Sequence, residues 1–568
     1  MATPRVSTVE LRVLDGPNLY YPRPAIKLTL EVPGWMRASE TTVREVAERL
    51  SMPPSLSPGA PGSEQRRRAT ARIGAQLTRR IAVASGVRRL AVRGRPGPAP
   101  DRIVIAFPWR RRAAAQALAT ETAGAMGALL RRSPARLIAE AGARLAAVDP
   151  GPEPTVTDPT TPVIQVTGTN GKTTTVRLLA HLVRTAGRSV AFSSTDGVYR
   201  DDGELVERGD YSGFGGAAMA LAQEPDIAVL ETARGGMLLR GAGVLHNDVA
   251  VVTNVSADHL GLHGVDTVDQ LAEVKGIITR ITRPDGWDVL NADDPRVLAM
   301  RRSATGRPWL FSTHPDHPAL REALREGGRA MSIQDGRLTW FSDHRAHPMV
   351  AMLDVPMTLA GVSRINAQNA MAAAAAALAI GLPHRAVVKG LKTFVQDPEH
   401  NPGRANLFSI GGTVVMIDYA HNEAGMSGLV ETLDGLRPRG GHVWLAICTA
   451  GDRTNEILRS FAFLAAVGSD HLAVAELPRY LRGRSREDII ERLQDGAETA
   501  GVHEVTVYPD ELTALRAMVD EARPGDVVGV TALGMRPEIF AWLEDAGATR
   551  MRPGDVRRVV RRAQASRA

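Results

Sequence analysis

The sequence predicts an α/β fold of three domains: a small α+β domain, a central parallel-sheet domain, and a smaller Rossmann-like α/β domain. A chain of 568 residues is too long for one ordinary hydrophobic core. A segment rich in Pro, Asp and Thr, "DPGPEPTVTDPTTP" at residues 149–162, has the composition of an exposed linker. After this linker, short apolar runs alternate with helical patterns, which indicates crossovers over a buried parallel sheet.

The composition is that of a globular protein without a membrane span. Hydrophobic residues make up 44% and charged residues 23%, which favours neither disorder nor membrane insertion. No apolar run approaches the roughly 18 to 20 residues that cross a bilayer, and the start "MATPRVSTVELRV" lacks the order of a signal peptide. We therefore expect a cytoplasmic protein with no membrane partner. The single cysteine, Cys448, lies in the apolar run "HVWLAICTA" and is expected to fill the core.

Basic runs raise the alternative of nucleic-acid binding. The chain has 69 Lys and Arg against 62 Asp and Glu, with arginines concentrated in "EQRRRATARIGAQLTRR", "FPWRRRAAAQ" and "RRVVRRAQASRA". Such runs can bind a polyanion, but they also occur on solvated helix faces. Aromatic residues are only 4% and do not interleave with the basic runs, as a base-stacking surface requires. The sequence favours solvated faces over a nucleic-acid interface.

The N-terminal domain is predicted to span residues 1–148. Apolar residues alternate with polar ones from Ile26 to Val32, which is the period of a half-buried strand. Helical patterns follow at about 40–52, 66–86 and 110–148, and the extended segment "RIVIAFPW" precedes the last of them. These elements predict a small α+β domain.

The two α/β domains are predicted at residues 163–396 and 397–568. In the first, the expected strands are "PVIQVTG", "SVAFSST", "DIAVLET", "DVAVVTNVS" and "WDVLNADDP", separated by helices and one loop. The helical segment "AALAIGLPHRAVVKGLKTF" closes this domain. A second alternating series begins at "ANLFSIGGTVVMIDYAHN" and ends at "GDVVGVTAL", which suffices for a smaller α/β domain.

A candidate phosphate-binding loop follows the first strand of the central domain. "VTGTNGKTTT" departs from the general pattern G-x-x-x-x-G-K-[ST], because Val166 stands where that pattern has its first glycine. The order of apolar strand, glycine loop and helix is nevertheless retained. Gly168 and Gly171 allow backbone N–H groups to approach phosphate, Lys172 can reach the β and γ phosphates, and Thr173 can hold Mg²⁺. This context predicts a nucleoside triphosphate site rather than a structural turn.

Two further strand ends carry possible metal ligands. Glu231 directly follows "DIAVL", and Asp258-His259 follows "VAVVTNVSA". Taken singly, Glu231 could be a surface acid and His259 a packed or capping histidine. Because ligands bind at the carboxyl ends of parallel strands, however, both residues should converge on the phosphate loop. Together they indicate a Mg²⁺ site.

Eight motifs in order resemble the Mur ligase superfamily, and most closely the Mur-type domain of the cyanophycin synthetase family. They are "VTGTNGKTTT", "LETARGG", "NVSADHLGLHG", "LAEVKGII", "LNADDP", "NAQNAMAA", "NPGRANLF" and "DYAHN", within residues 160–560. Val166 is normal in that superfamily. The N-terminal "LDGPNLYYPRPAIKLTLEV" is also similar to the start of cyanophycin synthetases. That family has an ATP-grasp domain where this chain has only residues 149–162, so the resemblance implies a single ligation activity.

The resemblance implies roles for residues around a bound ATP and two Mg²⁺ ions. Asn369 would contact adenine, Asp418 the ribose, and Arg404 the phosphates, with His421 and Asn422 beside the nucleotide. Lys275 occupies the place of a lysine that many Mur ligases carry as a carbamate. Asp452, Arg453, Arg482 and Arg484 would lie in the same cleft. The implied nucleotide loop is Gly168, Thr169, Asn170, Gly171, Lys172, Thr173 and Thr174, and the implied metal ligands are Thr173, Glu231, His259 and Lys275, with Lys172, Glu231, His259 and Lys275 as the catalytic set.

The implied reaction is an ATP-dependent condensation of a carboxylate with an amine. Its substrates would be a small-molecule or peptide-like acceptor and an amino acid or amine, joined through an acyl phosphate with release of ADP and phosphate. A cyanophycin-type acceptor comes first, and a peptidoglycan precursor or a folate second. Two other classes remain open: a non-catalytic ATP-binding regulatory or scaffold subunit derived from a Mur ligase, and a nucleic-acid-binding protein. A monomer and a homo-oligomer are both compatible with the sequence.

Overall fold

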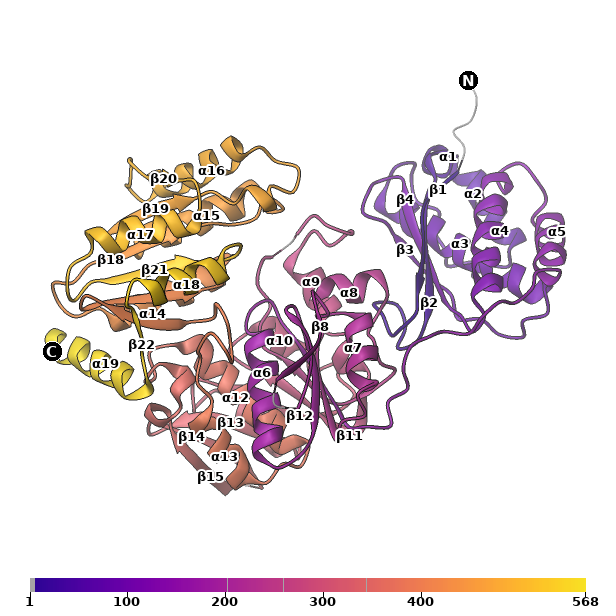
Figure 1. The fold of residues 1–568 in the computed structure, drawn as a ribbon. Coiled ribbons are helices and arrows are strands. Elements are labelled where there is room, and N and C mark those ends of the chain that lie inside the picture. The colour runs from indigo at the N-terminus through magenta and orange to yellow at the C-terminus, as the bar shows by residue number, and fades with distance from the viewer. Residues whose placement is uncertain (1–5, 202, 259, 344) are drawn as a thin grey trace. The chain divides into compact units, whose positions relative to one another are not determined.

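The computed structural model describes residues 6–201, 203–258, 260–343 and 345–568 (Figure 1). These residues form two compact units. The first contains the chain up to Thr160 together with Ser212–Ala218 and Thr232–His246, and the second contains Thr161–Tyr211, Met219–Glu231 and Asn247–Ala568. None of the helices in the described part of the chain has the length and hydrophobicity that a bilayer span requires.

The first unit is built on a four-stranded antiparallel sheet with the order β1-β2-β4-β3. Helices α3 and α4 pack on this sheet, and α5 packs against both of them. The strands are β1 (Ser7–Leu14), β2 (Ala25–Glu31), β3 (Arg93–Pro96) and β4 (Arg102–Pro108), and the helices are α1 (Pro33–Arg37), α2 (Glu40–Arg49), α3 (Glu64–Ala84), α4 (Arg112–Ala128), α5 (Pro134–Ala146) and α8 (Arg234–Leu239).

The predicted strand and helices of this unit are present, with one helix divided in two. The helical pattern at 110–148 forms α4 and α5, and Pro134 stands in the first turn of α5. Proline fits that position because the first N–H groups of a helix have no intrahelical acceptor. Strands β1 and β3 were not predicted. Both lie at the edges of the sheet, where only one neighbouring strand constrains the sequence pattern.

Arginines of the basic runs are bound within the protein. Arg66 is fully buried, and its guanidinium donates to four backbone carbonyl oxygens at 2.6 to 3.0 Å. Arg68 pairs with Glu64 at 3.2 Å, and in the C-terminal helix Arg567 pairs with Asp434 at 3.0 Å. Arg68 and Arg567 are consistent with the predicted solvated helix faces, whereas Arg66 is a core residue and corrects that prediction at its position.

The central sheet of the second unit has the order β15-β14-β13-β12-β11-β10-β5-β9-β6-β7-β8. Its strands are β5 (Val163–Thr167), β6 (Val190–Ser194), β7 (Gly197–Arg200), β8 (Glu204–Arg208), β9 (Ile227–Glu231), β10 (Asn247–Val252), β11 (Thr282–Asn291), β12 (Arg307–Ser312), β13 (Arg329–Gln334), β14 (Arg337–Ser342) and β15 (Arg345–Ala351). Its helices are α6 (Lys172–Thr185), α7 (Phe214–Leu221, which begins in the first unit), α9 (Val268–Lys275), α10 (Pro295–Met300), α11 (Pro318–Arg325), α12 (Arg364–Ala379) and α13 (His384–Thr393), with 3-10 turns at Ile278–Arg280, Met352–Asp354 and Pro356–Thr358.

The predicted parallel sheet is confirmed in the middle of this arrangement. From β13 to β6 all neighbouring strands are parallel, whereas β14 and β15 at one end and β7 and β8 at the other are antiparallel. The helix expected between β6 and β9 is α7, and the β7–β8 hairpin, which was not predicted, precedes it. Hairpins of four or five residues per strand give too short an alternation to be distinguished from loops.

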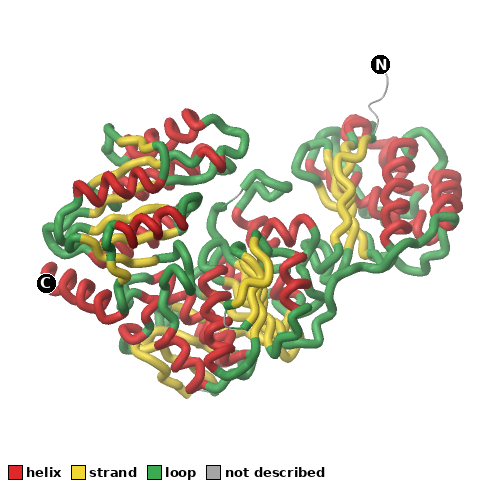
Figure 2. The backbone as a smooth tube through the Cα atoms, viewed as in Figure 1, coloured by secondary structure: helices red, strands yellow, loops and turns green. Residues whose placement is uncertain are grey.

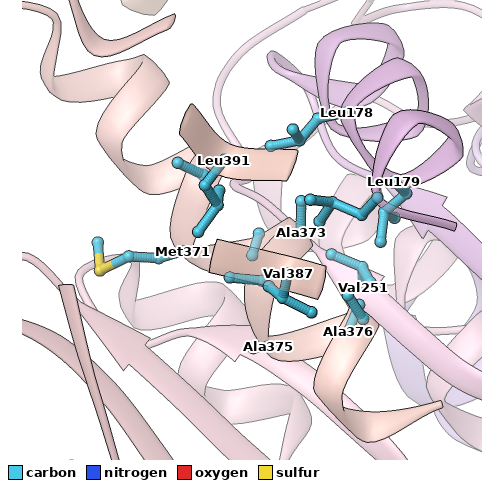
Figure 3. Packing of buried hydrophobic residues seen from close by; sticks show 14 of the residues in the cluster. Leu178, Leu179, Val251, Met371, Ala373, Ala375, Ala376, Val387 and Leu391 are labelled. Atoms are coloured by element: carbon cyan, nitrogen blue, oxygen red, sulfur yellow. The ribbon is translucent and has the colours of Figure 1, made fainter. Parts of the chain in front are cut away.

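An alanine-rich helix brings the core of this domain together. Helix α12 contains the run Ala372–Ala377, all fully buried. Alanine has no side chain beyond Cβ, so the helix can approach its neighbours closely, and it is also the best helix former. Figure 3 shows Ala373 and Ala376 among side chains of α6, β10 and α13, which form one hydrophobic cluster. This packing fixes α6, whose first turn follows the phosphate loop.

The C-terminal domain has a sheet of its own (Figure 2). Its strand order is β20-β19-β18-β21-β17-β16-β22, and two hydrophobic clusters lie on its two faces. Strands β20 to β17 are parallel, and β16 and β22 are antiparallel. The strands are β16 (Asn406–Ile410), β17 (Thr413–Asp418), β18 (Val443–Ile447), β19 (His471–Ala475), β20 (Thr506–Tyr508), β21 (Val527–Thr531) and β22 (Thr549–Arg550); the helices are α14 (Glu423–Leu436), α15 (Asn455–Val467), α16 (Arg486–Thr499), α17 (Glu511–Glu521), α18 (Arg536–Asp545) and α19 (Pro553–Arg567), with a 3-10 turn at Pro478–Tyr480.

Cys448 lies in the core of the C-terminal domain, as predicted. Its thiol donates to Glu511 Oε1 at 3.0 Å and to the carbonyl oxygen of Thr531 at 3.1 Å. Burial and the neighbouring Glu511 raise the pKa of the Cys448 thiol well above its ordinary value. The thiolate that a nucleophile requires is therefore disfavoured.

A buried carboxylate, Asp288, joins the start of β11 to the residue before β12. Its oxygens accept from Thr282 Oγ and from the backbone N–H of Gly306, both at 2.8 Å. Burial raises the pKa of Asp288 to about 7, against the hydrogen bonds from Thr282 and Gly306, which lower it. The folded protein thus holds a proton on Asp288 at a pH where the unfolded chain has released it.

We predict that Asp288 makes the protein less stable as pH rises from about 4 to about 7. In this window the folded state binds more protons than the unfolded state, so the free energy of unfolding falls with pH, by about 2 kcal/mol between pH 5.5 and 7. Asp288→Asn can keep both contacts, because Thr282 Oγ also donates to the carbonyl of Ile278 and can accept from an amide. Chemical unfolding at pH 5.5 and 8 should show a smaller loss in Asp288→Asn than in the wild type; equal losses would contradict the assignment.

Candidate functional site

The loop between β5 and α6 has the backbone geometry of a phosphate cradle. Gly168 and Gly171 have φ of 155° and 85°, conformations that side chains rarely allow. A Cβ at Gly168 would lie 1.9 Å from Thr253 Oγ, and a Cβ at Gly171 would lie 2.1 Å from Asn369 Oδ1. Both glycines are therefore required by the conformation and by the space. Gly171 immediately precedes α6, so the N-terminal N–H groups of that helix face the loop.

The loop is held in place by the end of β10. Asn254 Oδ1 accepts from the N–H of Asn170 at 2.8 Å, and the carbonyl of Asn254 accepts from the N–H of Thr169 at 2.9 Å. Thr253 Oγ donates to the carbonyl of Asn170 at 2.6 Å. These bonds fix the loop backbone without using the N–H groups at the start of α6.

Lys172 and Thr174 lie at the start of α6, directly after the glycine loop. Lys172 Nζ donates to the carbonyl of Thr169 at 2.9 Å, so its ammonium group lies over the loop. Thr174 is buried and accepts from the side-chain amide of Asn401 at 3.3 Å. Asn401 belongs to the segment that joins the two sheets of the second unit, and this bond connects that segment to α6.

Thr173 and Glu231 form the centre of the candidate metal site. Thr173 Oγ donates to Glu231 Oε2 at 2.8 Å and lies 3.2 Å from Thr195 Oγ. Glu231 is 1% exposed, and its Oε1 is buried without a hydrogen-bond partner in the described structure. Burial raises the pKa of Glu231, although the charges of Lys172 and Arg404 oppose that effect. An unsatisfied buried carboxylate oxygen beside hydroxyls is what a hard divalent cation would complete.

Lys275 reaches the same loop from the end of α9. It is 4% exposed, and its Nζ donates to the carbonyl of Gly168 at 2.6 Å. Lys172, Glu231 and Lys275, predicted from separate strands and helices, therefore meet at one loop. His259, the fourth member of the predicted catalytic set, lies outside the described residues.

Asn369 lies beneath the loop, on α12. It is 2% exposed; its Oδ1 accepts from Thr175 Oγ at 3.5 Å and its Nδ2 donates to Asn366 at 3.2 Å. The contact with Gly171 places this amide at the point where the loop enters α6.

The C-terminal domain contributes Arg404 and Asp418. Arg404 Nη2 donates to Thr173 Oγ at 3.3 Å, and its guanidinium lies 4.7 Å from the ring centre of Tyr419. Asp418 Oδ2 accepts from the N–H of Ala405 at 2.8 Å. Burial raises the pKa of Asp418, with Arg404 as the largest opposing charge. The arginine assigned to phosphate is thus at the phosphate loop.

A pair of asparagines links the two domains across the loop. Asn170 Nδ2 donates to Asn422 Oδ1, and Asn422 Nδ2 donates to Asn170 Oδ1, each at 3.0 Å. Asn422 also caps α14 by accepting from the N–H of Gly425 at 2.9 Å. The "DYAHN" segment therefore contacts the phosphate loop directly.

His421 and the "GDR" segment meet a strand-end acid. His421 Nε2 lies 3.8 Å from Asp258 Oδ2, and Arg453 Nη2 lies 3.4 Å from Asp258 Oδ1. Arg453 also pairs with Asp452, and Arg484 donates to the carbonyl of Arg453 at 2.9 Å. Arg482, by contrast, is exposed, with a positive φ of 52°. Of the two arginines in "LRGR", only Arg484 is joined to this cluster.

Several residues at the site were not predicted. Asn254 follows β10, Thr195 and Asp196 follow β6, and Arg536 follows β21. The strand-end rule that selected Glu231 would have selected the first three as well. Arg536 had no comparable signal, because its position depends on how the C-terminal domain packs on the central one. As a whole the site combines the buried Lys275, the partly buried Lys172 and arginines of a second domain with a carboxylate that can bind a metal ion, which suits a polyphosphate.

Comparison with known proteins agrees with this geometry. Residues 166–377 match the Mur ligase middle domain, and residues 403–534 match the Mur ligase glutamate ligase domain. Cyanophycin synthetase of Synechocystis is 37% identical over 65% of this chain and 42% of its own length. UDP-N-acetylmuramyl-tripeptide synthetase of Deinococcus radiodurans is 29% identical over 66% of this chain and 73% of its own length. The chain thus spans less than half the length of the cyanophycin synthetase it matches.

A solved enzyme structure shares its fold with a large part of this chain. The bifunctional folylpolyglutamate synthase/dihydrofolate synthase of Yersinia pestis, complexed with AMPPNP and Mn, has a TM-score of 0.51 and 22% identity. The match covers 67% of this chain and 89% of that one. With the matched middle and C-terminal domains, the glycine loop and the ordered motifs, this chain belongs to the Mur ligase superfamily.

Proposed function

We propose that the protein is an ATP-dependent ligase that forms an amide or isopeptide bond between a carboxylate and an amine. The observation that carries this proposal is the convergence on Thr173: Glu231 of the central domain and Arg404 of the C-terminal domain both bond to its hydroxyl. A carboxylate that can bind a metal ion and a guanidinium that can bind phosphate meet at the first turn of α6, directly after the glycine loop. This arrangement suits a metal-bound triphosphate.

The reaction class follows from the charges at the site. A carboxylate is a poor electrophile because its negative charge is delocalised, so it must be activated before an amine can attack it. Transfer of the γ-phosphoryl group to the carboxylate gives an acyl phosphate, and amine attack then releases phosphate. Lys172 and Arg404 can neutralise charge that develops on the transferred group, and the first-turn N–H groups of α6 can hold the remaining phosphates. No protein nucleophile is needed, in agreement with the buried Cys448.

A divalent cation fits beside Thr173. Glu231 Oε1 and the hydroxyls of Thr173 and Thr195 supply oxygen ligands of the kind that Mg²⁺ prefers. When bound, Mg²⁺ would supply charge neutralisation and orient the phosphates. The related Yersinia pestis enzyme was solved with AMPPNP and Mn, which supports a nucleotide with a divalent metal.

Further assignments complete the proposed site. Lys275, as a carbamate, and His259 would hold a second Mg²⁺ ion, and the burial of Lys275 beside Gly168 supports its place there. Asn369 would contact adenine and Asp418 the ribose. Asn422 and His421 would lie beside the triphosphate, supported by the direct contact of Asn422 with Asn170.

The proposed substrates are an amino acid or amine and an amino-acid-derived or peptide-like carboxylate. A cyanophycin-type acceptor ranks first, since the cyanophycin synthetase match has the higher identity of the two relatives compared. A peptidoglycan precursor and a folate rank second, after the names of the tripeptide synthetase and of the folylpolyglutamate synthase.

We predict that the protein releases ADP and phosphate only when both an acceptor carboxylate and an amine are present. The test is a screen of ADP release over amino acids paired with candidate acceptors, with Lys172→Ala as the inactive control. Release of AMP and pyrophosphate would exclude the acyl-phosphate route. ATP binding without turnover for any pair, together with full cellular function of Lys172→Ala, would instead favour a regulatory subunit.

Glu231→Gln should weaken nucleotide binding only when metal is present. The amide can still accept from Thr173 Oγ but has no charge to hold a cation, so affinity for MgATP should fall about 10- to 100-fold. Affinity for ATP in EDTA should not fall, because the substitution also removes a negative charge that repels the triphosphate. Calorimetric titration with Mg²⁺ and with EDTA measures the two affinities separately. An equal loss of nucleotide affinity under both conditions would show that Glu231 has a structural role.

Lys275→Ala should lower turnover about 10- to 100-fold, and added short-chain carboxylates should restore part of it, because a free carboxylate can replace a carbamate. The matched control is Lys389→Ala, which removes an exposed lysine of α13 and should keep wild-type turnover. Undiminished turnover in Lys275→Ala would exclude a catalytic role, and loss without rescue would argue against the carbamate.

A further inference from the structure

A carboxylate outside the predicted site, Asp196, gathers arginines from both domains of the second unit. Its side chain is 17% exposed and follows β6. Arg177 Nη2 of α6 lies 3.2 Å from Asp196 Oδ2, and Arg536 Nη2 of α18 lies 3.4 Å from Oδ1. Burial raises the pKa of Asp196, but the charges of Arg404, Arg536 and Arg177 outweigh it and hold the pKa below its ordinary value. Asp196 thus forms ion pairs with one arginine of each domain.

The backbone that carries Arg536 is fixed by a second buried carboxylate. Glu511 is 0% exposed, and its oxygens accept from the N–H groups of Leu533, Gly534 and Met535 at 2.7 to 3.2 Å. These three residues directly precede Arg536, the first residue of α18. The Arg536 side chain therefore starts from a rigid position.

Arg536 in turn holds the segment next to Arg404. Its Nη1 donates to the carbonyl of Pro402 at 3.2 Å. Gly403 has a φ of 70°, and a Cβ there would lie 2.4 Å from Arg536 Cδ, so the glycine packs directly on the arginine side chain. The guanidiniums of Arg536 and Arg404 also lie on the same ring, 5.3 and 4.7 Å from the centre of Tyr419.

Arg404 is left with an unused donor. One of its Nη atoms donates to Thr173 Oγ, while its Nε is buried without a hydrogen-bond partner in the described structure. A buried guanidinium N–H without an acceptor is costly, and a phosphate oxygen would satisfy it.

We infer that Asp196 is a positioning residue: through Arg536 and the Pro402–Gly403 backbone it holds Arg404 at the phosphate loop, so that triphosphate binding depends on a carboxylate that never touches the nucleotide. The inference rests on the proposed function. It adds to that proposal how Arg404 of the C-terminal domain is positioned before the nucleotide binds.

A simple electrostatic role for Asp196 predicts the opposite result. A negative charge near the loop repels a triphosphate, so its removal would tighten nucleotide binding if Asp196 acted only through its field. If Asp196 positions Arg404, removal of its charge leaves the guanidiniums of Arg177 and Arg536 without their common partner and weakens binding. The sign of the change therefore separates the two roles.

The test is calorimetric titration of MgAMPPNP into the full chain and its variants. We expect Asp196→Asn to weaken binding about tenfold, a usual size for coupling between sites, and Arg536→Gln to weaken it similarly. Since Asp196 acts through Arg404, Asp196→Asn combined with Arg404→Gln should bind no more weakly than Arg404→Gln alone. Unchanged or tighter binding in Asp196→Asn, or additive losses in the double variant, would overturn the inference.

Controls separate positioning from general destabilisation. Glu399→Gln removes an exposed ion pair, with Arg550, in the same region of the chain and should keep wild-type affinity. If Asp196→Asn fails to fold, Arg536→Gln decides, because its side chain is 25% exposed and its loss leaves Asp196 paired with Arg177. A wild type without affinity for MgAMPPNP overturns the proposed function and this inference with it; intact affinity in both single variants overturns the inference alone.

Discussion

The hydrogen bond between Thr173 and Glu231 is the contact on which the rest of the site depends. It joins the first turn of α6 to the end of β9 at 2.8 Å, in a place where Glu231 is almost fully buried. A carboxylate in such a position must be protonated, paired or bound to a cation. Lys172, Arg404 and the Thr173 hydroxyl oppose the effect of burial on its pKa, and one oxygen remains for a further ligand. The arrangement of cations around the loop is explained by this one buried acid.

The site is divided between two domains because the loop alone lacks sufficient positive charge and polar contacts. The central domain supplies the glycine loop, Lys172 and Glu231, and the C-terminal domain supplies Arg404 and Asn422. The reciprocal bonds between Asn170 and Asn422 make the loop part of the interface between the two sheets. A nucleotide at the loop would therefore contact both domains, and in the proposed reaction this would keep water away from the activated carboxylate.

Two acids outside the direct phosphate contacts, the fully buried Glu511 and the partly buried Asp196, organise the interface between the two sheets. Glu511 fixes the loop before α18 through three backbone N–H groups, and Asp196 joins α6 to α18 through Arg177 and Arg536. Glu511 accepts hydrogen bonds from backbone N–H groups, and Asp196 forms ion pairs with two arginines, so both acids bind protein groups rather than solvent. Such networks stabilise one arrangement of the domains because any other arrangement leaves a buried charge unpaired.

The sequence by itself determined the parallel sheet, the glycine loop and the strand-end acid Glu231, because each depends on local order: an apolar strand, a turn that needs glycine, and a helix. It also indicated Lys172, Thr173 and, through family resemblance, Lys275 and Arg404, all of which meet at the loop. Only the tertiary structure decided that Asn170 pairs with Asn422 and that Arg536 stands beside Arg404. Asn170 and Asn422 are 252 positions apart in the sequence. Arg536, which reaches the segment next to Arg404 by donating to the carbonyl of Pro402, is 134 positions from that proline. No local periodicity records them, since they arise from the packing of one domain on another.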